Sequence, residues 1–171
     1  MPIRVARAAL HYWEEPCISG TAGSGAVFFC GCNLQCVFCQ NEKISRGRVG
    51  KNITTQRLSD IFLELQDKGA NNINLVTAGH FADQVVEALE NAKSEGLVIP
   101  VVYNTSSYES LETIRKFDGL VDTYLPDMKF RSSEISGEFT KAYDYFEVAS
   151  QAIAEMVRQT GEPEFFVKKR A

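Results

Sequence analysis

The sequence lacks an apolar run that approaches the length of a membrane span, and its first residues do not resemble a secretory signal peptide. It also lacks an excess of positive charge, because 18 lysines and arginines face 22 acidic residues and leave a net charge of −4. Proteins that bind nucleic acid are usually basic, so nucleic acid is not an expected partner. By default, these absences predict a cytoplasmic protein without membrane contact.

Internal repeats and low-complexity linkers are absent as well, so nothing divides the 171 residues into separate domains. A chain of this length can enclose one hydrophobic core. We expect a single domain over residues 1–171, with a lead-in segment over residues 1–23 and an irregular tail over residues 162–171.

Short β-rich runs alternate along the chain with stretches whose apolar residues recur at helical spacing. The predicted strands cover residues 26–29, 73–76, 98–103 and 121–125. The predicted helices cover residues 55–68, 80–95 and 142–159, and a further helix follows a capping pair of Ser106 and Glu109. Such alternation is typical of an α/β fold with right-handed βαβ units and a parallel sheet. Unusual residues follow each predicted strand, so we expect them to meet at one edge of the sheet.

Cysteine is scarce outside one segment, CGCNLQCVFCQN over residues 30–41. A tight cysteine cluster in a chain without a secretory signal indicates a metal site before it indicates disulfides. Cys32, Cys36 and Cys39 can ligate three irons of a [4Fe–4S] cluster and leave the fourth iron open. Cys17 stands apart, and we expect a small buried side chain there.

A structural zinc site is the alternative, with Cys30 as its fourth ligand. Structural zinc sites usually combine two separated cysteine pairs, and the sequence offers no second pair. We therefore expect Cys30 to be a packed residue at the end of a strand.

The sequence around these cysteines resembles the radical S-adenosylmethionine superfamily. CNLQCVFC has the superfamily's three-cysteine spacing, with an aromatic residue just before the last cysteine. The segments HYWEEPCISG, INLVTAGHF, YNTSSYES, YLPDMKF and YDYFEVASQAIAEM resemble a branch related to pyruvate formate-lyase activating enzymes. The resemblance implies a barrel of about six βα units, of which this chain supplies about four. We therefore expect an incomplete, TIM-like barrel.

The resemblance also implies a reaction. S-adenosylmethionine would bind the open iron through its amino and carboxylate groups. One electron would then break a carbon–sulfur bond and give methionine and a 5′-deoxyadenosyl radical, which abstracts hydrogen from a substrate. By analogy with activating enzymes, that substrate could be a backbone glycine of a glycyl-radical protein. A small-molecule substrate, or an iron–sulfur or zinc module without turnover, are the alternatives.

Several residues correspond to positions of the family's cofactor sites. Phe38 corresponds to the aromatic residue beside the adenine, although it could instead be a core phenylalanine. Thr77 and Gly79 belong to TAGH, which stands where activating enzymes carry a Gly-Gly-Glu stretch that binds an amino group. The acidic residue is missing here. His80, in the same stretch, could move a proton or simply begin a helix near solvent.

Two later strands contribute the other positions. Asn104 and Thr105 resemble contacts to a ribose or a carboxylate. Asp127 and Lys129 correspond to an Asp-x-Lys pair that suits ribose hydroxyls and the methionine carboxylate. A surface ion pair is the alternative interpretation of that pair.

The basic run Lys43, Arg46, Arg48 and Lys51 follows the cysteine segment in an acidic protein. It could steer an acidic reductant such as flavodoxin or ferredoxin, or be an ordinary solvated loop. A sheet that stops after four parallel strands would also leave an unpaired edge, through which two copies could dimerise.

Overall fold

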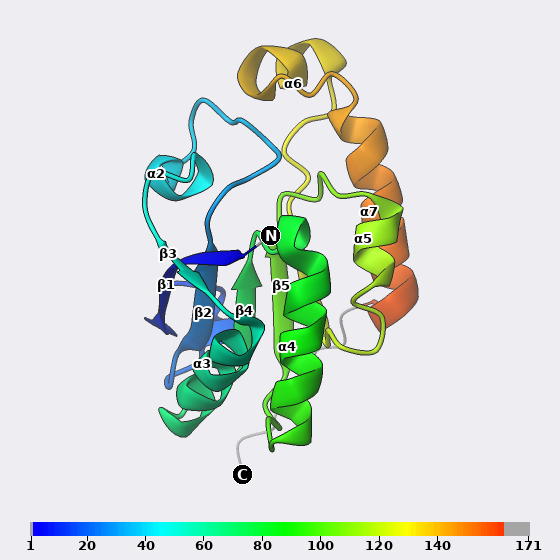
Figure 1. Cartoon of the computed structure of the whole chain (residues 1–171). Helices are drawn as coiled ribbons and strands as arrows, with labels where there is room; N and C mark the ends of the chain where they lie inside the picture. Colours follow the sequence, from blue (N-terminus) through cyan, green and yellow to red (C-terminus); the bar gives the residue numbers. More distant parts are fainter. Residues whose placement is uncertain (1, 163–171) are drawn as a thin grey trace.

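The computed structural model describes residues 2–162 as an open sheet with helices packed against it (Figure 1). The strands are β1 (Ile3–His11), β2 (Ser24–Phe29), β3 (Lys51–Ile53), β4 (Ile73–Val76), β5 (Val101–Thr105) and β6 (Thr123–Pro126). The helices are α1 (Pro16–Ser19), α2 (Glu42–Ser45), α3 (Thr55–Asp67), α4 (Ala82–Ser94), α5 (Leu111–Arg115), α6 (Ser133–Thr140) and α7 (Tyr145–Thr160), with a 3₁₀ turn η1 (Gly79–Phe81). The fold is therefore α/β, as predicted.

The sheet has the strand order β3-β1-β2-β4-β5-β6 and is not closed. β2, β4, β5 and β6 are parallel neighbours, whereas β1 pairs antiparallel with both β2 and β3. The carboxyl ends of the four parallel strands consequently lie at one end of the sheet, which is uppermost in Figure 1. The cysteine segment and α6 lie at that same end.

α3 forms where its sequence combines a cap with an apolar face. The Thr54 hydroxyl accepts a hydrogen bond from the Arg57 backbone N–H at 3.1 Å and so caps the first turn. Gly69 follows the helix in the left-handed region, with φ of +83°. The buried face consists of Leu58, Ser59, Ile61, Phe62 and Leu65.

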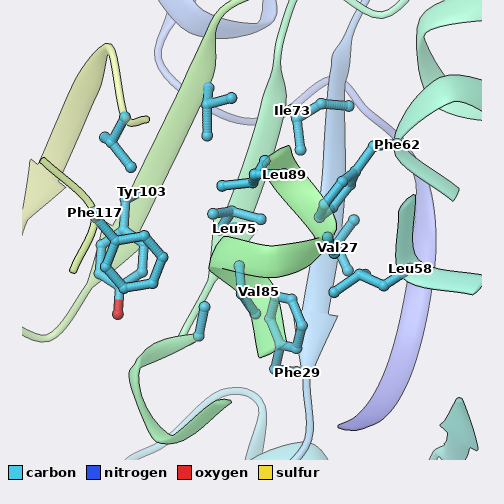
Figure 2. Close-up of a cluster of buried hydrophobic side chains, with 14 of the residues drawn as sticks. Val27, Phe29, Leu58, Phe62, Ile73, Leu75, Val85, Leu89, Tyr103 and Phe117 are labelled. Atoms are coloured by element: carbon cyan, nitrogen blue, oxygen red, sulfur yellow. The ribbon is translucent and has the colours of Figure 1, made fainter. Parts of the chain in front are cut away.

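One hydrophobic core fills the space between the sheet and the two helices α3 and α4, which pack side by side (Figure 2). Its labelled members are Val27, Phe29, Leu58, Phe62, Ile73, Leu75, Val85, Leu89, Tyr103 and Phe117. Burying each large side chain stabilises the fold by about 1.5–3 kcal/mol. Since successive strand residues point to opposite faces, Asn74 and Val76 on β4 face away from this core.

Two local predictions were wrong in ways that the hydrogen bonds explain. β5 begins at Val101 rather than at residue 98, because Pro100 has no N–H and the backbone N–H groups of residues 98 and 99 bind Gln66 Oε1 instead. The cap of α5 is Ser110, whose hydroxyl accepts from the Thr113 N–H at 3.1 Å. The predicted pair of Ser106 and Glu109 does not cap it.

Burial corrects one further expectation, because Cys17 lies exposed on α1 and is not a buried hydrophobe. On the last helix, α7, Tyr145 is fully buried, whereas Phe146 beside it is 43% exposed.

The segment expected as a lead-in carries β1, which the sequence did not indicate. β6 is one edge of the sheet in residues 2–162, and the dimer expected through it stays a prediction. The irregular tail expected from residue 162 lies almost entirely outside the described residues. Over residues 2–162, no helix combines the length and apolarity that crossing a membrane requires.

Candidate functional site

The cysteine segment leaves β2 through a turn that separates Cys30 from the other cysteines. Cys30 is 4% exposed, and its thiol donates to the Val49 carbonyl at 3.0 Å. It is the packed strand-end residue that we expected. Gly31 follows with φ of +95°, a conformation that favours glycine. The chain then continues at the end of the sheet where the parallel strands have their carboxyl ends.

A cavity of about 750 Å³ lies at the carboxyl edge of the sheet. Its size falls within the range that is usual for small-molecule sites. The lining residues come from every segment that was predicted to meet there, and also from β1: Arg7, His11, Trp13, Glu14, Phe28, Cys32, Leu34, Cys36, Phe38, Cys39, Gln40, Asn41, Val76, Thr77, Asn104, Ser106, Asp127 and Lys129.

Cys32, Cys36 and Cys39 are half-buried and all face this cavity. Burial raises the pKa of the Cys32 and Cys36 thiols, and proximity to the other cysteines raises each of them further. Two contacts oppose this: the Leu34 N–H donates to Cys32 Sγ at 3.4 Å, and the Lys129 ammonium lowers the pKa of Cys36. The thiolate forms of Cys32 and Cys36 are therefore unfavourable alone, and a cationic iron centre would stabilise them.

The cysteines do not converge on one point. In residues 2–162, no three histidine, cysteine, aspartate or glutamate side chains lie close enough to hold a single metal ion. Zinc ligands at about 2.3 Å from the metal would bring their sulfurs within about 4 Å of one another. A cubane spreads its cysteines over separate irons, so three soft ligands around one cavity fit a cluster better than zinc.

Phe38 is 55% exposed and is not a core phenylalanine. Its ring lies against Phe130 and Phe139, with ring centroids 6.0 and 6.3 Å away. The Val37 N–H donates to the Phe139 carbonyl at 3.0 Å and so joins the cysteine segment to α6. The ring lines the cavity as an apolar wall that a flat ligand could contact.

The TAGH stretch after β4 contributes one side chain to the cavity. Thr77 lines it with φ of +58°, which is uncommon for a β-branched residue, and its N–H donates to the Asn104 carbonyl at 3.0 Å. Gly79 does not line the cavity. A Cβ there would collide with the Glu109 carboxylate, so the glycine permits close packing against a buried acid.

Glu109 is 8% exposed and accepts hydrogen bonds from the Tyr103 and Thr105 hydroxyls, both at 3.0 Å. Burial raises its pKa, and these two donors oppose the rise. The Thr105 hydroxyl is thus hydrogen-bonded to Glu109, and Thr105 does not line the cavity, whereas its neighbour Asn104 does. This division follows from the alternation of side chains along β5.

His80 does not line the cavity either. Its Nε2 lies 2.7 Å from the Cys30 carbonyl, and its ring packs on Phe81 at 4.2 Å between centroids. Desolvation lowers its pKa. The histidine therefore joins the TAGH stretch to the start of the cysteine segment.

Asp127 and Lys129 follow β6 and form an ion pair with each other while both line the cavity. Tyr145 on α7 fixes the backbone around them. Its hydroxyl accepts from the Lys129 N–H at 2.9 Å and lies 2.8 and 2.9 Å from the Ser106 and Asp127 carbonyls, to one of which it donates. Nothing in the local sequence marks Tyr145, because its partners are remote along the chain.

The wall formed by β1 and the turn after it was not predicted. Arg7, His11, Trp13 and Glu14 line the cavity on the side away from β6. The conspicuous HYWEEP segment was a signal for this wall, but only the pairing of β1 with β2 brings these side chains to the cavity.

Comparison with known proteins agrees with this geometry. The model of the radical SAM superfamily matches residues 26–156. An uncharacterised protein of Methanocaldococcus jannaschii is 32% identical over 146 residues, which cover 81% of this chain and 42% of that relative. The chain thus spans about two fifths of the length of the curated relative that it matches.

Proposed function

The chain belongs to the radical SAM superfamily, and from this premise we propose that it is an enzyme that reductively cleaves S-adenosylmethionine in the cavity described above. Members of this superfamily typically bind a [4Fe–4S] cluster together with S-adenosylmethionine. The observation that carries the proposal is that three cysteines, Asn104 and the Asp127–Lys129 pair line one cavity.

Cys32, Cys36 and Cys39 would hold the cluster. When bound, the cluster supplies the electron that yields methionine and a 5′-deoxyadenosyl radical for hydrogen abstraction. The protein's own contribution is positioning. The Lys129 ammonium suits a carboxylate, Asp127 suits ribose hydroxyls, and Asn104 offers both a donor and an acceptor beside them. Phe38 provides an apolar wall for the adenine.

The TAGH stretch would bind the amino group through backbone carbonyls and the Thr77 hydroxyl, because it contains no acidic residue. Gly79 would serve this stretch by packing against Glu109 rather than by touching the ligand. Thr105 would act in the same indirect way, since its hydroxyl holds Glu109 in place.

Two classes of substrate are compatible with this chemistry. The resemblance to activating enzymes favours a backbone glycine of a glycyl-radical protein. The polar wall of Arg7, His11 and Glu14 favours a small molecule instead. A cluster-binding module without turnover is the third hypothesis, and the experiment below distinguishes it from an enzyme that acts on either class of substrate.

The test is anaerobic reconstitution of the cluster, followed by an assay for 5′-deoxyadenosine with dithionite and S-adenosylmethionine. We expect about four irons per chain and a change in the reduced cluster's paramagnetic resonance signal when S-adenosylmethionine is added. Replacing Cys32, Cys36 or Cys39 by serine should abolish 5′-deoxyadenosine formation. Cys17→Ser is the matched control and should retain full iron, because Cys17 is exposed on α1.

The assay also discriminates between the alternative hypotheses for the function. One zinc and no iron would overturn the proposal. A cluster that binds S-adenosylmethionine without cleaving it would support the module without turnover. Adding candidate glycyl-radical proteins to the same assay tests the substrate class.

A further inference from the structure

We propose that the cavity wall formed by Arg7, His11, Trp13 and Glu14 is a binding subsite for a small organic anion with an apolar body. The idea that this anion donates the hydrogen atom rests on the function proposed above. The existence of the binding subsite does not.

Arg7 is the anchor of this subsite. It lies opposite Phe28 in the register of β1 and β2, and both residues line the cavity. Opposed residues of this kind have Cβ atoms about 4.5–5.5 Å apart. Within residues 2–162, no carboxylate forms an ion pair with the Arg7 guanidinium. A planar guanidinium offers paired donors, which match the two oxygens of a carboxylate.

Aromatic side chains lie next to this cation. The His11 and Phe28 rings meet edge to face, with centroids 6.1 Å apart. Trp13, the only tryptophan of the chain, is 89% exposed although it lines the cavity. So exposed an indole contributes little to the protein's own core, but it can cover the apolar body of a ligand.

Glu14 does not neutralise the subsite. Its carboxylate lies 3.9 Å from His11 Nε2 and its side chain is only 14% exposed, while its N–H donates to Ser19 Oγ at 3.0 Å. Burial raises the pKa of Glu14, and His11 partly offsets that rise. Glu14 lies against His11 and forms no ion pair with Arg7 within residues 2–162, so Arg7 stays available for an anion from outside.

The subsite is separate from the Asp127–Lys129 pair. β1 and β6 stand four strand spacings apart in the sheet, and each spacing is about 4.8 Å. Arg7 and Lys129 therefore extend into the cavity from strands that are not neighbours. Lys129 is moreover paired with Asp127, whereas no acidic side chain in residues 2–162 pairs with Arg7. A neutral backbone glycine would leave the Arg7 guanidinium without a partner, which favours an acid over a peptide.

The test measures binding of 3-phenylpropionate, its neutral amide and acetylglycine amide to the cluster-loaded chain by calorimetry, with Trp13 fluorescence as a second signal. We expect the acid to bind on the order of tenfold more tightly than its amide, as a charge-assisted hydrogen bond provides. Arg7→Gln should remove this difference while the amide still binds. Arg4→Gln, the same change on the same strand outside the cavity lining, should preserve it.

Equal binding of acid and amide, or an undiminished preference in Arg7→Gln, would overturn the subsite. Tighter binding of acetylglycine amide would assign the wall to a peptide instead. A loss in Lys129→Gln as large as that in Arg7→Gln would place the anion at the Asp127–Lys129 pair and also overturn it. None of these binding measurements requires cleavage of S-adenosylmethionine. A chain that binds the acid selectively but does not cleave S-adenosylmethionine would therefore contradict the proposed function and not the subsite.

Discussion

Glu109 is the residue on which two separate segments, the TAGH stretch and β5, depend. Its carboxylate lies behind Gly79 and holds the hydroxyls of Tyr103 and Thr105, and it is 8% exposed. It therefore supports the TAGH stretch from outside the cavity. An acid buried among neutral hydrogen-bond donors makes the stability of the fold sensitive to pH.

The free energy of unfolding of Glu109→Gln should increase relative to that of the native chain as the pH rises. Burial raises the folded-state pKa of Glu109 above its usual value of 4.5, so the folded protein holds this proton more tightly than the unfolded chain does. Its contribution is complete below pH 4.5 and is lost as the pH climbs through the raised pKa. Glutamine keeps an acceptor oxygen for both hydroxyls and carries no charge. Thermal unfolding at a series of pH values above 4.5 measures the growing difference.

Glu112→Gln is the matched control for this prediction, because the Glu112 side chain is 84% exposed on the adjoining helix α5. Its melting temperature should follow the native chain at each pH. A constant offset between Glu109→Gln and the native protein would show instead that the Glu109 charge is compensated in the folded state.

Among the elements, β4 carries an unusual contrast between two buried asparagines. Asn72, just before the strand, accepts from the Ser24 hydroxyl at 2.6 Å and donates to the Ile18 carbonyl at 2.8 Å. Asn74 is fully buried, and neither polar atom of its side chain has a hydrogen-bond partner in the part of the chain that the structure describes. Burying an unpartnered amide group costs about 1–3 kcal/mol.

Asn74→Val should therefore raise the free energy of unfolding by about 1–2 kcal/mol, since valine also favours a strand. Asn72→Val is the control and should lower the free energy of unfolding by about 1–3 kcal/mol, because the Ser24 hydroxyl and the Ile18 carbonyl lose their hydrogen-bond partner. Urea unfolding of both variants gives the comparison. Equal destabilisation by the two changes would mean that Asn74 has a bound water or another partner in solution.

The same elements show what could be predicted from the sequence. The apolar spacing of Leu58, Phe62 and Leu65 predicted α3, and the cysteines could be grouped because they are neighbours in the chain. β1 could not be predicted, since it is rich in alanine and a bulge between Val5 and Arg7 breaks its alternation. Whatever depended on β1 was hidden with it, including the approach of Arg7 to the cavity. The partners of Tyr145 could not be predicted for a different reason, because they lie 16 and 39 positions away and only tertiary packing brings them together. The same holds for the packing of Gly79 against Glu109, although the Tyr103 and Thr105 partners of Glu109 lie only six and four positions before it.

At the scale of the whole molecule, an acidic chain presents a basic surface beside one of its cysteines. A shallow cavity of about 430 Å³ is lined by Cys32 together with Arg46 and Arg48. Both arginines lie 3.4 Å from Glu42, so part of their charge is locally balanced. The net charge of −4 would repel an acidic reductant at long range, and this surface is where such a protein could approach the proposed cluster.

We propose flavodoxin or ferredoxin as the electron donor, and the double change Arg46→Glu and Arg48→Glu tests it. Reversing both charges should slow cluster reduction by flavodoxin on the order of tenfold at low salt, because electrostatic steering governs such association rates. The difference should shrink as added salt shortens the screening length. Lys68→Glu with Lys93→Glu changes the net charge equally at the far ends of α3 and α4, and stopped-flow reduction of that variant separates local steering from overall charge. If both double variants slow reduction to the same extent, the effect belongs to net charge. If neither does, the reductant docks elsewhere.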